Sequence, residues 1–210
     1  MIDKRSSKPE QHPHLAFVLE ESLMARFFYL LQLGARIRRR VGCTVDAFLR
    51  EELGAGPETI EKIQSIMLDG KPVDDIGSAV IHDGSTLALS AAMPGLVGAT
   101  LRRGGAYSSF RNAITYHEMG TASAPVEGWV RIKIFNLLMA EMGPGILRMG
   151  ILLEAGDLID FLAERAQELA PGCRATLDGK PVDILHLRDD AGLHRAGQVL
   201  LTVSSGETAG

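Results

Sequence analysis

The stretch Leu68-Asp69-Gly70-Lys71-Pro72-Val73-Asp74 occurs a second time, residue for residue, as Leu177-Asp178-Gly179-Lys180-Pro181-Val182-Asp183. One Asp-Gly-Lys-Pro would indicate only a turn, because Asp and Gly tolerate the backbone conformations that tight turns require. Seven identical residues in two places indicate an internal duplication. If the duplication is real, the residues around the two copies should also follow one common pattern.

An amphipathic helix is predicted upstream of each copy. The apolar residues that follow helical spacing are Val45, Phe48, Leu49 and Leu53 in the first half, and Leu158, Phe161, Leu162, Ala166 and Leu169 in the second. Thr44 and Asp157 are the expected N-caps, and Gly54 and Gly172 are the expected ends of the two helices. Both halves therefore carry a helix at the same place relative to the repeat.

Strands are predicted on both sides of each helix and repeat. Downstream, a glycine precedes the apolar runs 86–89 and 199–203. Upstream, we expect one hairpin from strands at 27–31 and 37–41 around Gly34, and another from strands at 130–134 and 151–153. The second hairpin would be closed by a loop that contains Gly143-Pro144-Gly145.

Each half then has the order strand, strand, helix, strand, turn, strand, which predicts an α+β fold. We expect two β-grasp (ubiquitin-like) units in tandem, each a mixed sheet of four to five strands with one packed helix. The predicted organisation is a disordered tail at 1–14, a first unit at 15–91, an apolar and Gly-rich connecting segment at 92–125 and a second unit at 126–210. A unit of this size is long enough to fold alone.

Both halves resemble the small sulfur carriers of molybdopterin and thiamine biosynthesis, over roughly 24–91 and 129–206. The opening strand is similar at Val130–Phe135, the helix start at Gly42–Val45 and Gly156–Leu158, the turn at Asp69-Gly70 and Asp178-Gly179, and the last strand at Gly84–Leu87 and Gly197–Val199. The resemblance implies a β-grasp fold. It also implies a C-terminal glycine thiocarboxylate and an adenylating enzyme as partner.

The tail departs from that family's pattern. Carriers end in Gly-Gly, whereas this chain ends in Gly206-Glu-Thr-Ala-Gly210. Gly104-Gly105 follows the first half, but the chain continues beyond it and leaves no carboxylate there. If the chain is a working carrier, Gly206, after trimming, or Gly210 would supply the carboxylate.

Composition and charge limit the remaining classes of function. The net charge is −4, and residues 126–210 hold 8 basic against 12 acidic residues, so a general nucleic-acid binder is not expected. No apolar run reaches the roughly 18 residues of a membrane span, and the polar start of the chain predicts neither a signal peptide nor an anchor. We expect a cytoplasmic protein that binds neither nucleic acid nor membrane.

Few residues suggest chemistry. The stretch 186–194, with His186, Asp189, Asp190 and His194, has four candidate ligands and is an alternative metal or small-molecule site, although a solvated loop is favoured. Other candidates are Cys43, Cys173 and the pairs His12/His14, His82-Asp83 and His117-Glu118. Gly104–Ser109 is a weak phosphate-loop candidate. Each has a simpler structural interpretation, so we expect no cofactor, no metal and no enzyme.

Two features point instead to binding. Arg36, Arg38 and Arg40 share one face of a strand, where they either bind an acidic partner or, the favoured interpretation, prevent edge-to-edge aggregation. Met93, Leu96, Val97 and Leu101 form an apolar set at helical spacing, interrupted by Gly95 and Gly98. We therefore predict a non-enzymatic module that binds a protein partner, which includes the option of a second copy of itself.

Overall fold

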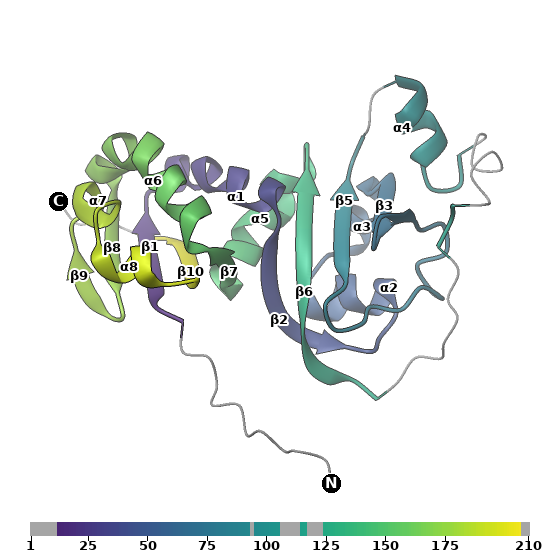
Figure 1. Cartoon of the computed structure of the whole chain (residues 1–210). Coiled ribbons are helices and arrows are strands. Elements are labelled where there is room, and N and C mark those ends of the chain that lie inside the picture. Colours follow the sequence, from purple (N-terminus) through teal and green to yellow (C-terminus); the bar gives the residue numbers. More distant parts are fainter. Residues whose placement is uncertain (1–11, 93–94, 106–113, 117–123, 207–210) are drawn as a thin grey trace, which may run out of the picture.

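The computed structural model describes residues 12–92, 95–105, 114–116 and 124–206, and has an α+β fold built on one ten-stranded mixed sheet (Figure 1). The strand order across the sheet is β4-β3-β5-β6-β2-β7-β10-β1-β8-β9. The strands are β1 (His14–Leu19), β2 (Ala35–Val41), β3 (Ser65–Leu68), β4 (Lys71–Pro72), β5 (Thr86–Ser90), β6 (Val126–Phe135), β7 (Ile151–Glu154), β8 (Cys173–Leu177), β9 (Lys180–Val182) and β10 (Gln198–Ser205). The predicted α+β class is confirmed.

Apolar residues alternate along the strands and therefore gather on one face of the sheet. Helices cover this face, and the apolar residues between the helices and the sheet form one continuous core. In β1, for example, Leu15, Phe17 and Leu19 are buried, whereas the residues between them are partly exposed. The helical segments are η1 (Glu21–Phe27), α1 (Phe28–Leu33), α2 (Val45–Ala47), η2 (Phe48–Glu52), α3 (Pro57–Lys62), α4 (Gly95–Leu101), α5 (Leu138–Met149), α6 (Ala155–Leu169), η4 (Ala170–Gly172), α7 (Ile184–Leu187) and α8 (Ala191–Arg195).

The sheet divides into two groups of five strands with the same pattern of pairing. The first strand group is β4-β3-β5-β6-β2 and the second is β9-β8-β1-β10-β7. Read in these orders, the pairs in each group are antiparallel, antiparallel, parallel and antiparallel. The groups are joined where β2 pairs with β7 through Arg36 and Leu152. The duplication in the sequence thus has a counterpart in the strand pairing.

Each strand group contains one strand from the other half of the chain. The N-terminal strand β1 lies between β10 and β8, inside the second group. Strand β6, which follows the connecting segment, lies between β5 and β2, inside the first group. The sheet therefore does not follow the sequence boundaries predicted at residues 91 and 126. His14, placed by prediction at the end of a disordered tail, is the first residue of β1, and residues 1–11 lie outside the described part.

The repeated aspartates show how β1 fits into the second group. Asp69 and Asp178 both adopt a positive φ, next to the glycines of their turns. The Asp69 carboxylate accepts a hydrogen bond from the backbone N–H of Thr86, at the start of β5, over 2.7 Å. The Asp178 carboxylate accepts one from the N–H of His14, at the start of β1, over 2.9 Å. The turn predicted at each repeat is confirmed, and its aspartate also fixes the neighbouring strand.

The helix predicted from Val45 to Leu53 is confirmed as α2 continued by η2. Thr44 caps it, because its hydroxyl accepts the backbone N–H of Ala47 over 3.3 Å. Gly54 follows with a positive φ of 67°. In the second half the predicted cap is wrong: α6 begins at Ala155, so Asp157 lies within its first turn. An acidic side chain there still faces the positive end of the helix dipole.

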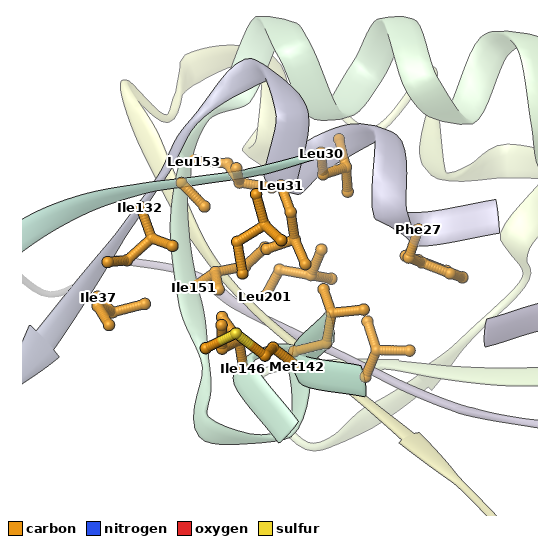
Figure 2. Packing of buried hydrophobic residues seen from close by; sticks show 14 of the residues in the cluster. Phe27, Leu30, Leu31, Ile37, Ile132, Met142, Ile146, Ile151, Leu153 and Leu201 are labelled. Atoms are coloured by element: carbon orange, nitrogen blue, oxygen red, sulfur yellow. The ribbon is translucent and has the colours of Figure 1, made fainter. Parts of the chain in front are cut away.

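The strand predicted at 27–31 is wrong, because this segment is helical. Phe27, Leu30 and Leu31 point into the core, as Figure 2 shows, whereas Tyr29 is 48% exposed. Burial at 27, 30 and 31 is helical spacing; a strand would bury alternate residues. Aromatic and leucine residues without turn signals fit either element when the run is short. In the helical segment, the Phe27 ring packs against Phe161 of α6.

The loop predicted at Gly143-Pro144-Gly145 is also wrong, because these residues lie inside α5. Pro144 removes one helical hydrogen bond. Burial of Met142 and Ile146 against the middle of the sheet offsets that loss (Figure 2). Gly143 has a packing role: a Cβ added there would lie 2.7 Å from a ring carbon of Phe28, so the glycine lets α1 and α5 approach closely.

The two glycines of α5 should respond in opposite ways to alanine. Gly145→Ala meets no atom within 4 Å, so the gain in helix propensity should make it neutral or stabilising by up to about 1 kcal/mol. Gly143→Ala collides with the Phe28 ring and should cost about 1–3 kcal/mol. Urea unfolding of the two variants measures this difference. Equal effects at the two positions would contradict the packing of α1 on α5.

Candidate functional site

A cavity of about 280 Å³ opens on the face of the sheet opposite the core, over β3, β5 and β6. Its floor follows from the register, because Ser65 lies opposite Ser90 and Met67 lies opposite Ala88. Residues directly opposite each other in an antiparallel pair project to the same side, and the alternating residue Ile66 is buried in the core. Small side chains at Ser65, Ala88 and Ser90 leave the space that larger residues would fill.

Ser65 is the most unusual residue of this cavity. It is only 2% exposed, and its hydroxyl has no hydrogen-bond partner; among the described residues, no other buried side-chain nitrogen or oxygen is in this position. Buried polar side chains are nearly always hydrogen-bonded, so an exception requires an explanation. Ser65 gave no signal in the sequence, because a serine in a short strand is ordinarily a solvated residue.

The opposite side of the cavity is held by a small polar network. The Asn136 side-chain amide donates to the Ser90 hydroxyl over 3.1 Å and to the backbone carbonyl of Ala92. Ser90 in turn donates to the same carbonyl over 3.1 Å. Asn136 has a positive φ of 60°, a conformation that asparagine tolerates better than most residues. The network fixes the chain that leaves β5 against the end of β6.

Helix α4 lies beside this cavity, and Val97 and Gly98 line it. In Figure 1, α4 stands apart from the other helices, next to β3 and β5. Within the predicted apolar set, Leu96 and Val97 are 73% and 64% exposed, Leu101 is partly buried, and Met93 lies outside the described residues. The predicted helix is confirmed, and it leaves two large apolar side chains uncovered by the described chain.

Leu137 belongs to the same region and was missed from the sequence. It follows Asn136 directly and is 75% exposed. We define the α4 surface as Leu96, Val97 and Leu137: Val97 lines the cavity, Leu96 precedes it on α4, and Leu137 directly follows Asn136, which also lines the cavity. The run Phe135-Asn136-Leu137-Leu138 could have given the signal, because Asn in an apolar run indicates a turn, where one of the flanking apolar residues is often exposed.

The arginine stripe on β2 is engaged within the chain. Arg36 lies over the Trp129 ring, 4.9 Å from its centroid, Arg38 pairs with Glu127 at 3.4 Å, and Arg40 pairs with Glu52 at 2.7 Å. The hydrogen bond from Arg40 to Glu52 raises the pKa of the guanidinium. The structure does not bring the three arginines together with the α4 surface as one site, so binding of an acidic partner stays a prediction.

The stretch 186–194 is not a loop but spans parts of α7 and α8. His186 lies 2.9 Å from the Asp183 carboxylate, and the His194 ring lies 2.7 Å from the carbonyl of Arg188. Asp190 caps α8 by accepting the backbone N–H of Leu193. Across the described ranges, no three His, Cys, Asp or Glu side chains gather in a way that could hold a metal ion.

The two cysteines are both free thiols. Burial raises the pKa of the Cys173 thiol to about 12, and burial also raises the pKa of Cys43. A low thiol pKa is what activates a nucleophilic cysteine, and these shifts run in the other direction. Among the candidate histidines, the His14 ring lies 2.9 Å from the Thr202 hydroxyl, and His117 lies outside the described residues.

Gly206 lies at the end of β10, where its N–H donates to the carbonyl of Leu19 over 3.1 Å. A Cβ added at this position would lie 2.9 Å from a side-chain carbon of Val18, so Gly206 packs closely against β1. Gly210 lies outside the described residues, as do 106–109 of the glycine-rich stretch. The carrier tail remains a prediction from the sequence.

Comparisons with known proteins give no family for this chain. The chain matches no protein-family model, no curated protein and no solved structure. Over the part of the chain that the structure describes, no helix has both the length and the apolar character needed to cross a membrane.

Proposed function

We propose that this chain is a non-enzymatic binding module that contacts a protein partner through the α4 surface. The observation that carries the proposal is the exposure of Leu96, Val97 and Leu137, three large apolar side chains that either line one cavity or directly adjoin one of its lining residues in sequence. Exposed apolar clusters of this kind are typical of interaction sites, whereas isolated exposed leucines are common everywhere. A partner that covers these residues would remove their apolar surface from water, which favours association.

We further propose that the two strand groups are β-grasp (ubiquitin-like) units. The support is the repeated pattern of pairing, in which a parallel central pair is flanked by antiparallel strands in both groups. Each group also packs a helix that lies just upstream of the repeat, α2 with η2 in one and α6 in the other. In this proposal the units form a rigid platform, and the α4 surface lies on the outer face of the first.

A second copy of the chain is the first partner to test. Most soluble homo-oligomers use a two-fold axis, which brings the same surface of two copies together. Leu96, Val97 and Leu137 would then contact their own counterparts. The proposal therefore expects either self-association or the capture of a different protein by the same residues.

The test compares charged substitutions on and away from the α4 surface. Val97→Asp with Leu137→Asp should abolish association, measured by light scattering across protein concentrations and by affinity capture from native cells. Leu185→Asp on α7 is the matched control, since Leu185 is also an exposed leucine, at 45%. A wild-type chain that stays monomeric and captures the same proteins as the double variant would contradict the proposal.

A further inference from the structure

We propose that the cavity over β3, β5 and β6 binds a small, neutral and mainly apolar molecule that carries one hydrogen-bonding oxygen. Val97 of the α4 surface lines this site, and the inference does not depend on which protein that surface contacts. It rests on the chemistry of the residues that line the cavity: one hydroxyl without a partner, apolar walls and no charge.

The Ser65 hydroxyl supplies the hydrogen bond. It is buried on the floor of the cavity without a partner in the protein, while the Ser90 hydroxyl opposite it is already both donor and acceptor. A hydroxyl can donate one hydrogen bond and accept others, so Ser65 fits a ligand hydroxyl or carbonyl oxygen. Ligand sites typically combine apolar walls with a few such polar groups, which set the orientation of the ligand.

The walls select an apolar and uncharged molecule. Among the described residues that line the cavity, Met67, Val97 and Phe135 contribute apolar side chains, and none of the lining residues is charged. Burying an ion without a counter-charge is costly, so carboxylates and phosphates are disfavoured. A second cavity over β1, β8 and β9 differs in this respect, because Arg174 and Asp183 line it.

The size of the cavity limits the ligand to a small one. Its volume of about 280 Å³ lies just under the lower end of the range for drug-sized ligands, roughly 300–1,000 Å³. A single substituted ring or a short branched chain fits this description better than a nucleotide or a large cofactor. Val97 and Gly98 of α4 form part of the wall.

Three related probes distinguish the contributions of a ring, a hydroxyl and a charge to binding in the cavity. Benzyl alcohol carries the ring and the hydroxyl, toluene carries the ring alone, and benzoate carries the ring with a charge. Each is titrated into the ¹⁵N-labelled full-length chain, and amide shifts are followed by NMR. We expect saturable shifts at residues 65–67, 88–90 and 135–136, with benzyl alcohol binding about five-fold more tightly than toluene and benzoate most weakly. Residues 174–176 in the second cavity should not respond.

Two variants complete the experiment. Ser65→Ala removes the hydroxyl without leaving a buried polar group, so it should fold and should bind benzyl alcohol and toluene equally. Ala88→Leu fills the cavity and should abolish binding of all three probes. The proposal is overturned if no probe gives saturable shifts at the cavity, if benzoate binds best, or if Ser65→Ala keeps the preference for benzyl alcohol.

Discussion

A chain that begins at Glu20 should fail to fold its second strand group. This deletion removes β1, which pairs on both sides, with β10 and with β8. Leu15, Phe17 and Leu19 are fully buried or nearly so, and the loss of each such side chain costs about 2–5 kcal/mol. The sum rivals the entire stability of a typical protein, about 5–15 kcal/mol. Residues 151–206 should then lose protection from hydrogen exchange.

A chain that begins at His12 is the matched control, because it keeps all of β1. Adding a synthetic peptide of residues 12–19 to the shorter chain should restore part of the protection, since a missing strand can be supplied by a separate peptide. Full protection of 151–206 without β1 would mean that the second half folds alone. This result would contradict the strand exchange, by which we mean the placement of β1 in the second strand group and of β6 in the first.

Phe27→Ala should be among the most destabilising single substitutions in this chain. Phe27 is fully buried, and its ring centroid lies 5.2 Å from that of Phe17 and 5.0 Å from that of Phe161. It therefore connects η1 with β1 and α6. Truncation of a buried phenylalanine costs about 3–5 kcal/mol, from lost burial and from the cavity that remains. The midpoint of urea unfolding should fall accordingly.

Tyr29→Ala distinguishes the helical structure of residues 27–31 from the strand that the sequence suggested. In a strand, residues 27 and 29 would share one face and both substitutions would be severe. In the helix, Tyr29 is about half exposed, so its truncation should cost well under half as much as that of Phe27. Comparable losses at the two positions would contradict the helical assignment.

Local signals in the sequence were sufficient where local interactions decide the structure. The helix after Thr44 and the turns at Asp69-Gly70 and Asp178-Gly179 depend on capping, spacing and backbone preference within a few residues. The predictions failed where distant contacts decide. Gly143-Pro144-Gly145 is helical because α5 packs on α1 and on the sheet, and nothing within that stretch indicates this partner.

The strand exchange could not be predicted from the repeat for the same reason. The repeat suggests that β10 should take the place in the second group that β5 takes in the first. In the first group, β5 lies next to β3. In the second group, β10 lies next to β7, and β1 takes the equivalent place next to β8. Apolar alternation assigns a strand to a sheet face but not to a neighbour. Asp178 could have supplied a constraint, because its counterpart Asp69 also binds the start of a neighbouring strand.

The candidate site was only half visible in the sequence. Leu96 and Val97 were found because their spacing is helical. Ser65 was not found, because it stands out only by being buried without a hydrogen-bond partner. That environment is created by Ala88, Ser90 and α4, which line the same cavity. A property created by several segments together is not encoded in any one of them.

The exchange of β1 and β6 between the strand groups is the central claim, and backbone NOEs in the intact chain test it most directly. The structure predicts cross-strand contacts between Phe17 and Ala175, and between Leu87 and Ile132, which are register partners in the β1–β8 and β5–β6 pairs. Contacts that place residues 14–19 beside β2 or β5 and residues 126–135 beside β7 or β10 would instead show two separate units, each built from its own half, and would contradict the account.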